Sequence, residues 1–347
     1  MSLNNIANAV RPRKAGAATT CGRCVPALVV FLVACAGPQY GGANVQHLLG
    51  SPILQGNAPH STSGFRSDIG GTKLLYVSES HGNLYVFSYP KIQLVGEISG
   101  FSQLDGLCVD RTGDVFVPDF GSGNIFEYPH GRAAPAAVLE EGSGPEPVDC
   151  DVDPTTGNVA VANYNAPGGA NIAIFPHLPR ADRVNPPEWG KPRIIADPQI
   201  TIEAACGFDA SGNLYIDGYN GSLQFAFAEL PAGARSFVNV TLPNKIKTYG
   251  AIRWDGSSLS LADYVAGVIY RINVVGSSAT IRGETRLEGS DGIAAYSFDR
   301  SNNARVAIVP NFNTVTVGTW AYPNGGPPLE SLQIFGQPEG AVVSEDK

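Results

Sequence analysis

A segment of about 45 residues recurs along this chain, and this recurrence constrains the fold more than any other feature. Each copy holds a short apolar strand, an aspartate, a tight turn and a second strand of alternating apolar residues. A third strand and a weaker fourth strand follow. The turn aspartates are separated by 43, 56, 46 and 44 residues, and they are Asp110, Asp153, Asp209, Asp255 and Asp299.

Four strands at this period are typical of a β-propeller blade. One four-stranded sheet cannot bury both of its faces alone, so neighbouring copies must stack around an axis. We count six copies, which predicts an all-β, six-bladed β-propeller with four-stranded antiparallel blades; seven blades are the alternative. The first copy, at 74–77, lacks an inner strand, and residues 340–344 have the pattern of one. We expect them to join blade one and close the ring, which leaves no open sheet edge.

The first 35 residues differ from the rest. Four basic residues and no acidic residue precede an apolar run at 25–33, which is too short to span a membrane but fits the apolar core of an export signal. The run ends in Leu32-Val33-Ala34-Cys35, which resembles a bacterial lipobox. This resemblance implies that Cys35 is acylated and becomes the first mature residue. Ordinary cleavage after Ala34-Cys35-Ala36 and a retained anchor are the alternatives.

These features predict three parts: a signal peptide with a lipobox at 1–35, a flexible tether at 36–68 and the propeller at 69–347. All 31 acidic residues but only 19 of the 23 basic residues follow Cys35, so the body carries a charge of about −12. Such a body is not expected to bind nucleic acid. We expect a monomer that meets the membrane only through its lipid, as an outer-membrane lipoprotein or a periplasmic or extracellular protein.

The repeats resemble those of a known family. GLCVDRTGDVFVPDF (106–120), CDVDPTTGNVAVANY (150–164) and CGFDASGNLYIDGY (206–219) resemble NHL-type propeller repeats, and the resemblance covers roughly 70–344. With its N-terminal signal and the YVFSYP of the first blade, the chain is similar to uncharacterised bacterial lipoprotein propellers. The resemblance implies a fold and says little about activity, because propellers include enzymes, receptors and scaffolds.

Residue types that recur in most blades are expected to be structural. The column at the end of the second strand is mostly Asp or Asn, and a Phe or Tyr follows it in most blades. Such side chains hydrogen-bond backbone amides in turns, so we assign this role to the column and to the turn aspartates. The neighbouring aromatic rings are expected to pack between blades.

The chemistry is sought where the blades differ. In NHL-like propellers the residues leading into the inner strands lie at one mouth of the central channel, and here they include Asp105, Glu146, Glu203, Asp291 and Glu339. Converging carboxylates could hold Ca²⁺, which prefers oxygen ligands. The resemblance to gluconolactonase-like propellers implies a Ca²⁺ that polarises a lactone carbonyl. The alternative is a solvated acidic rim.

No G-x-S-x-G elbow or H-E-x-x-H motif occurs, so catalytic residues stay unknown. The leading hypothesis is a non-catalytic binding or interaction scaffold for an unknown small molecule, glycan or protein. The alternative is a Ca²⁺-dependent hydrolase or lactonase at the channel mouth.

Blade three carries an insertion at roughly 176–192 that holds Trp189 among prolines. An exposed Trp189 would be a partner contact, and the alternative is that it covers the blade edge. Cys108, Cys150 and Cys206 lie in consecutive inner strands, with Cys108 one position out of register with the other two. Adjacent strand positions point to opposite faces, so we expect buried free thiols instead of a disulfide.

Overall fold

The structure is a computed structural model that describes residues 61–63, 73–178, 189–290, 292–299 and 305–346. The chain divides into a unit at Met1–Ile53 and a unit at Leu54–Lys347, and all described residues belong to the second unit. The predicted signal peptide, Cys35 and most of the predicted tether therefore lie outside the described residues. In the described ranges, no helix has the length and apolar character needed to cross a membrane.

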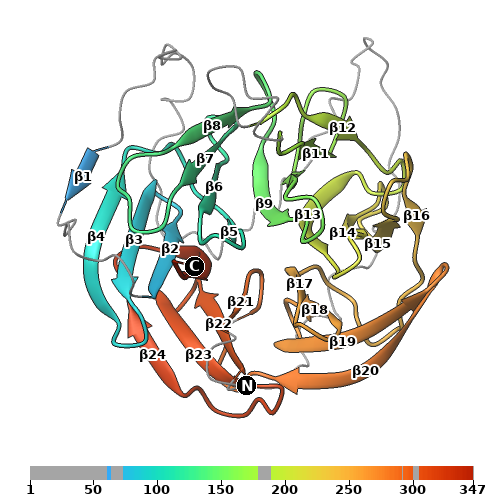
Figure 1. The fold of residues 1–347 in the computed structure, drawn as a ribbon. Coiled ribbons are helices and arrows are strands. Elements are labelled where there is room, and N and C mark those ends of the chain that lie inside the picture. Colours follow the sequence, from blue (N-terminus) through green and yellow to red (C-terminus); the bar gives the residue numbers. More distant parts are fainter. Residues whose placement is uncertain (1–60, 64–72, 179–188, 291, 300–304, 347) are drawn as a thin grey trace, which may run out of the picture. The chain divides into compact units, whose positions relative to one another are not determined.

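The described residues form six antiparallel sheets arranged as blades around a central channel (Figure 1). Blade one consists of β1 (Ser61–Ser63), β2 (Leu74–Glu79), β3 (Asn83–Ser88), β4 (Gln93–Ser99) and β25 (Pro338–Ser344). Blade two consists of β5 (Cys108–Val109), β6 (Val115–Asp119), β7 (Asn124–Tyr128) and β8 (Ala137–Glu140). Blade three consists of β9 (Pro147–Val152), β10 (Val159–Asn163), β11 (Asn171–Phe175) and β12 (Arg193–Ile195).

The other three blades repeat this pattern. Blade four consists of β13 (Ile202–Phe208), β14 (Leu214–Tyr219), β15 (Phe225–Leu230) and β16 (Val238–Asn239). Blade five consists of β17 (Ile252–Trp254), β18 (Leu259–Asp263), β19 (Val268–Val275) and β20 (Ser278–Arg286). Blade six consists of β21 (Ser297–Asp299), β22 (Arg305–Asn311), β23 (Thr316–Tyr322) and β24 (Glu330–Gln333).

Ring closure follows the prediction. In blades two to six the innermost strand comes first in the chain, whereas blade one takes its inner strand from β25. Strand β25 pairs with β2 in an antiparallel register that runs from Leu74 opposite Ser344 to Glu79 opposite Pro338. Blade one also has a fifth strand, because β1 pairs with β4 at its outer edge. The three residues of β1 come from the segment predicted as a tether.

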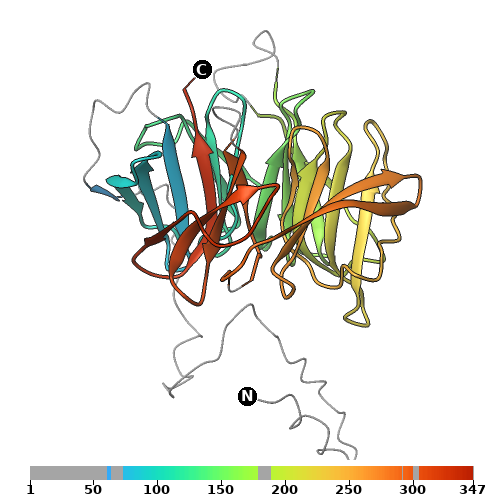
Figure 2. The same ribbon diagram turned by 90° about the horizontal axis from the view of Figure 1, so that it is seen from below.

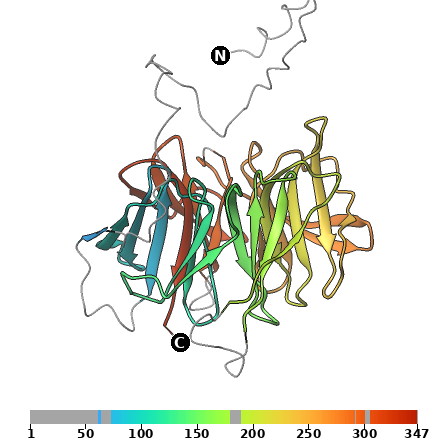
Figure 3. The same cartoon turned by 90° about the horizontal axis from the view of Figure 1, so that it is seen from above.

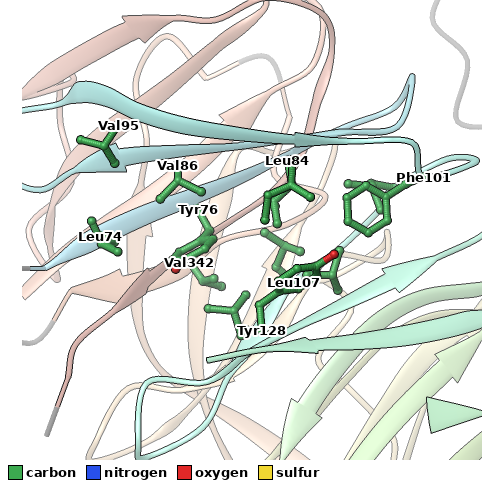
Figure 4. Close-up of a cluster of buried hydrophobic side chains, with 13 residues drawn as sticks. Leu74, Tyr76, Leu84, Val86, Val95, Phe101, Leu107, Tyr128 and Val342 are labelled. Atoms are coloured by element: carbon green, nitrogen blue, oxygen red, sulfur yellow. The ribbon is translucent and has the colours of Figure 1, made fainter. Parts of the chain in front are cut away.

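The hydrophobic core is divided among the contacts between neighbouring blades. Figure 4 shows the cluster between blades one and two, in which Tyr76 and Leu84 of blade one pack with Leu107 and Tyr128 of blade two. Strand β25 adds Val342, which is 3% exposed. Burying a large apolar side chain stabilises the fold by about 1.5–3 kcal/mol. The closing strand therefore contributes apolar packing as well as hydrogen bonds.

The repeated aspartates have the predicted structural role. The carboxylate of Asp110 accepts hydrogen bonds from the backbone amides of Thr112 and Asp114, both at 2.8 Å, which fixes the turn between the first two strands. Asp119, at the end of the second strand, accepts from the amide of Gln103 at 2.9 Å. It thereby holds the loop that leads into the inner strand of its own blade.

Cys108 and Cys150 form a disulfide with a Cα–Cα distance of 5.5 Å, so the expectation of free thiols is wrong for this pair. Stacked blades bring the front of one blade against the back of the next. Side chains that meet across two blades therefore lie on opposite strand faces, and the one-position offset of Cys108 allows the bond. Both cysteines belong to the cluster between blades two and three. Cys206, the free cysteine among the described residues, is buried as expected.

Candidate binding site on the turn face

The propeller has two faces, seen edge-on in Figures 2 and 3. We call the end that holds the turn aspartates, Asp110 and its counterparts, the turn face. We call the opposite end, where loops lead into the inner strands, the loop face. Strand β25 runs toward the turn face, because Ser344 follows the same inner-strand pattern as Asp110. The metal candidates predicted from the sequence lie before the inner strands or at their starts, and so belong to the loop face.

The candidate carboxylates on the loop face lie in different environments, and Asp105 and Glu339 are close enough to interact. Burial and then the charge of Asp105 raise the pKa of Glu339, while burial and then the charge of Asp149 raise the pKa of Asp105. Glu146 is only partly buried, and its backbone pairs with Tyr164 and Asn165.

Glu203 lies in a different environment. Its side chain is fully buried, and burial followed by the charges of Asp197 and Asp217 raises its pKa well above the ordinary value. Neither of its carboxylate oxygens has a hydrogen-bond partner among the described residues.

Within the described residues, no three His, Cys, Asp or Glu side chains are grouped so that they could hold a metal ion. Asp291, the remaining candidate, lies outside these residues. Ca²⁺ binding on the loop face therefore stays a prediction.

A buried ion pair joins blade five to blade three across blade four, and it was not predicted from the sequence. Arg253 of β17 reaches past β13 to Asp149 of β9, with Nη2–Oδ1 and Nη1–Oδ2 distances of 2.7 and 3.0 Å. Its Nη1 also donates to the carbonyl of Cys206 at 3.0 Å. Arg253 is 9% exposed. A charged residue inside an otherwise apolar inner strand was the available signal for this contact.

A cavity of about 1310 Å³ opens on the turn face. Its volume exceeds the roughly 300–1,000 Å³ of ordinary small-molecule pockets. Each blade contributes an apolar residue from the last or second-last position of its inner strand, one position before the turn aspartate or, in blade one, before Ser344. We call these six lining residues the apolar ring: Val109, Val152, Phe208, Trp254, Phe298 and Val343.

The rim of the cavity is acidic. Among the described residues that line it, seven are Asp or Glu and two are Arg. One of the two is Arg253, which already pairs with Asp149. Lys73, outside the lining, pairs with Asp299 at 2.9 Å and also with Glu345. The cavity thus keeps an excess of negative charge after these pairs are counted.

Trp189 borders the cavity but is not exposed on the surface. The ring is 9% exposed and packs edge-to-face on Phe116, with the ring centroids 5.5 Å apart. Its indole Nε1 donates to Oε2 of Glu127 at 2.7 Å. Trp189 thus covers the contact between blades two and three, which is the second of the two interpretations that the sequence allowed. Residues 179–188 of the insertion lie outside the described residues.

No family model and no curated protein matches the chain. Solved structures match it. A protein of unknown function from Bacteroides caccae is 12% identical, with a TM-score of 0.56, over 79% of this chain and 99% of that one. A chain in the nidogen/laminin complex is 11% identical, with a TM-score of 0.59, over 79% and 99%. The β-propeller domain of Cps50 (Swd1) from Myceliophteria thermophila is 10% identical, with a TM-score of 0.52, over 81% and 92%. This chain has the fold of a six-bladed β-propeller. At such low identity the likeness concerns the fold alone.

Proposed function

We propose that this protein is a non-catalytic binding protein that receives its ligand in the turn-face cavity. The apolar ring carries this proposal, because six blades each place an apolar side chain at the mouth of one large cavity. The cavity combines this ring with polar and charged groups, and such groups fix the orientation of a bound ligand. One propeller of similar fold occurs in a protein complex, that of nidogen and laminin, which is compatible with a binding role.

The proposal includes an NHL-type propeller that is exported and held by a lipid on Cys35. The lipobox at 32–35 supports the lipid. The Cys108–Cys150 disulfide supports export, because such bonds persist in oxidising compartments outside the cytosol. Mass spectrometry of the mature N-terminus tests the lipid: a diacylglycerol-modified Cys35 is expected, and an unmodified start at Gly37 would contradict it.

Binding in the cavity is tested with a mixed panel of neutral, anionic and cationic aromatic compounds, followed by ligand-observed NMR. At least one compound is expected to bind the unmodified protein and to lose most of its affinity in Phe298→Ala. Phe335→Ala is the matched control, because Phe335 is 78% exposed and does not line the cavity. Binders that tolerate Phe298→Ala, or a panel with no binder, would overturn the proposal.

A further inference from the structure

The apolar ring is uneven, and its two halves differ in chemistry. The aromatic members Phe208, Trp254 and Phe298 come from the consecutive blades four, five and six, while the valines come from blades one, two and three. One wall of the cavity is therefore bordered by aromatic residues. Phe208 is 5% exposed and belongs to the core, whereas Trp254 and Phe298 are half-buried, so Trp254 is the more exposed of the two indoles in the lining. An aromatic ring, and an indole above all, attracts an organic cation placed over its face.

The wall opposite the aromatic rings is acidic. In a ring of six blades, blades two and three lie across the channel from blades five and six, as Figure 1 shows for β5 and β17. Blade two contributes Asp110 and Asp114 to the lining, and blade three contributes Asp151 and Asp153. A ligand between these walls meets rings on one side and carboxylates on the other.

The cations near the cavity do not cancel this arrangement. Arg253 is held by two hydrogen bonds to Asp149 and by two backbone carbonyls. Its charge also acts on Asp151, which leaves Asp110, Asp114 and Asp153 as the carboxylates of the acidic wall. Arg111 is exposed on the turn of blade two, beside two carboxylates. An anionic ligand would enter against this excess of negative charge, whereas a cation would be attracted.

Resting on the proposed function, we propose that the turn-face cavity selects a small organic cation with an apolar body, such as a quaternary ammonium carried on an aromatic or aliphatic skeleton. The apolar body lies against the apolar ring, and the cationic centre lies between Trp254 and the carboxylates of blades two and three. A cation at this position is attracted both by the aromatic ring and by the carboxylates, and the two attractions add. A neutral or anionic molecule of the same shape gains neither attraction.

Three probes of similar shape and different charge test the ligand class: phenyltrimethylammonium, its neutral isostere tert-butylbenzene, and benzenesulfonate. Binding to the unmodified protein is followed through the fluorescence of Trp254, with Trp254→Phe to assign the signal, and by ligand-observed NMR. The cation is expected to bind at least tenfold more tightly than the neutral isostere, and its affinity is expected to fall as the salt concentration rises. Benzenesulfonate is expected not to bind.

Two variants separate charge from fold. Asp110→Asn combined with Asp114→Asn is expected to weaken the cation at least threefold and to leave the neutral isostere unchanged. Asp209→Asn is the matched control, because Asp209 is the equivalent turn aspartate of blade four and does not line the cavity. It is expected to leave both affinities unchanged.

Each other outcome contradicts the inference. Equal or tighter binding of tert-butylbenzene or benzenesulfonate would overturn the ligand class and leave the proposed binding function intact. If a lysine-containing peptide binds and the free cation does not, the cavity accepts a protein side chain instead of a small molecule. If no probe perturbs Trp254, the inference fails, and the mixed panel described above decides the proposed function independently.

Discussion

Arg253 and Asp149 are 104 residues apart in the chain, yet they form a buried ion pair that joins blade five to blade three across blade four. Burying two charges is costly, and the pair offsets that cost through two hydrogen bonds to each other and further bonds to backbone carbonyls. Removing one partner would leave the other charge buried and unpaired.

We therefore expect Arg253→Met to lower the free energy of unfolding by about 3–5 kcal/mol, because Asp149 keeps its charge without a partner. Arg253→Met combined with Asp149→Asn is expected to recover much of this loss, because the amide still accepts the hydrogen bond from the backbone of Cys206. Urea denaturation measures both variants. A double variant less stable than the single one would show that the pair does not act as a unit.

The disulfide closes a loop with a sequence separation of 42 residues. Its loss through Cys108→Ala combined with Cys150→Ala is expected to cost about 2–4 kcal/mol, mainly because the unfolded chain gains freedom. Thermal unfolding with and without reductant measures the effect, and the double variant should no longer respond to reductant. The remaining body cysteine, Cys206, is the control, because Cys206→Ala should keep that response. Titration of a reactive thiol at Cys108 in the unfolded, unreduced protein would contradict the bond.

Glu203 makes stability depend on pH. Burial, helped by the charges of Asp197 and Asp217, raises the pKa of this carboxyl well above its ordinary value of 4.5. The folded protein therefore holds the proton more tightly than the unfolded chain does. This contribution to stability is complete below pH 4.5 and is lost as the pH rises through the raised pKa of the folded state.

Glu203→Gln removes this titration, because glutamine stays neutral. We expect this variant to be more stable than the unmodified protein at pH 8 and to lose less stability between pH 5 and pH 8. Glu140→Gln, at an exposed position, is the control and should follow the unmodified protein. Denaturation at the two pH values makes the comparison. If Glu203→Gln and the unmodified protein lose the same stability between pH 5 and pH 8, the pH dependence belongs to other groups.

Strand β25 fills the inner edge of blade one, so its removal should open the ring. Deleting residues 338–347 is expected to expose the edge of β2 and to produce dimers or aggregates, because an unpaired edge strand pairs with other chains. Deleting only residues 346–347 leaves β25 intact and serves as the control. Size-exclusion chromatography distinguishes the two. A monomeric, cooperatively folding protein without 338–347 would show that closure is dispensable.

Local chemistry in the sequence was enough to predict the blades. Asp110 and Asp119 accept hydrogen bonds from backbone amides close to them in the chain. An Asp that recurs before a turn therefore predicts the conformation of that turn. The closing strand could be predicted because blade one lacked an inner strand and residues 340–344 had the pattern of one.

The site depended on relations that no local pattern contains. The pairing of Cys108 with Cys150 requires knowing which face of one blade meets which face of the next. The apolar ring requires seeing that six residues, one before each turn, meet at one mouth of the channel. The candidate carboxylates predicted from the sequence belong to the loop face, whereas the cavity of about 1310 Å³ lies on the turn face.

The position of β25 also has a consequence for how the protein is made. Ribosomes complete blades two to six before the chain reaches Pro338, so a growing chain holds every blade but has no closed ring. A chain that stops before Pro338 keeps the edge of β2 open. The ring can therefore close only after synthesis has passed Ser344, however early the other five blades form.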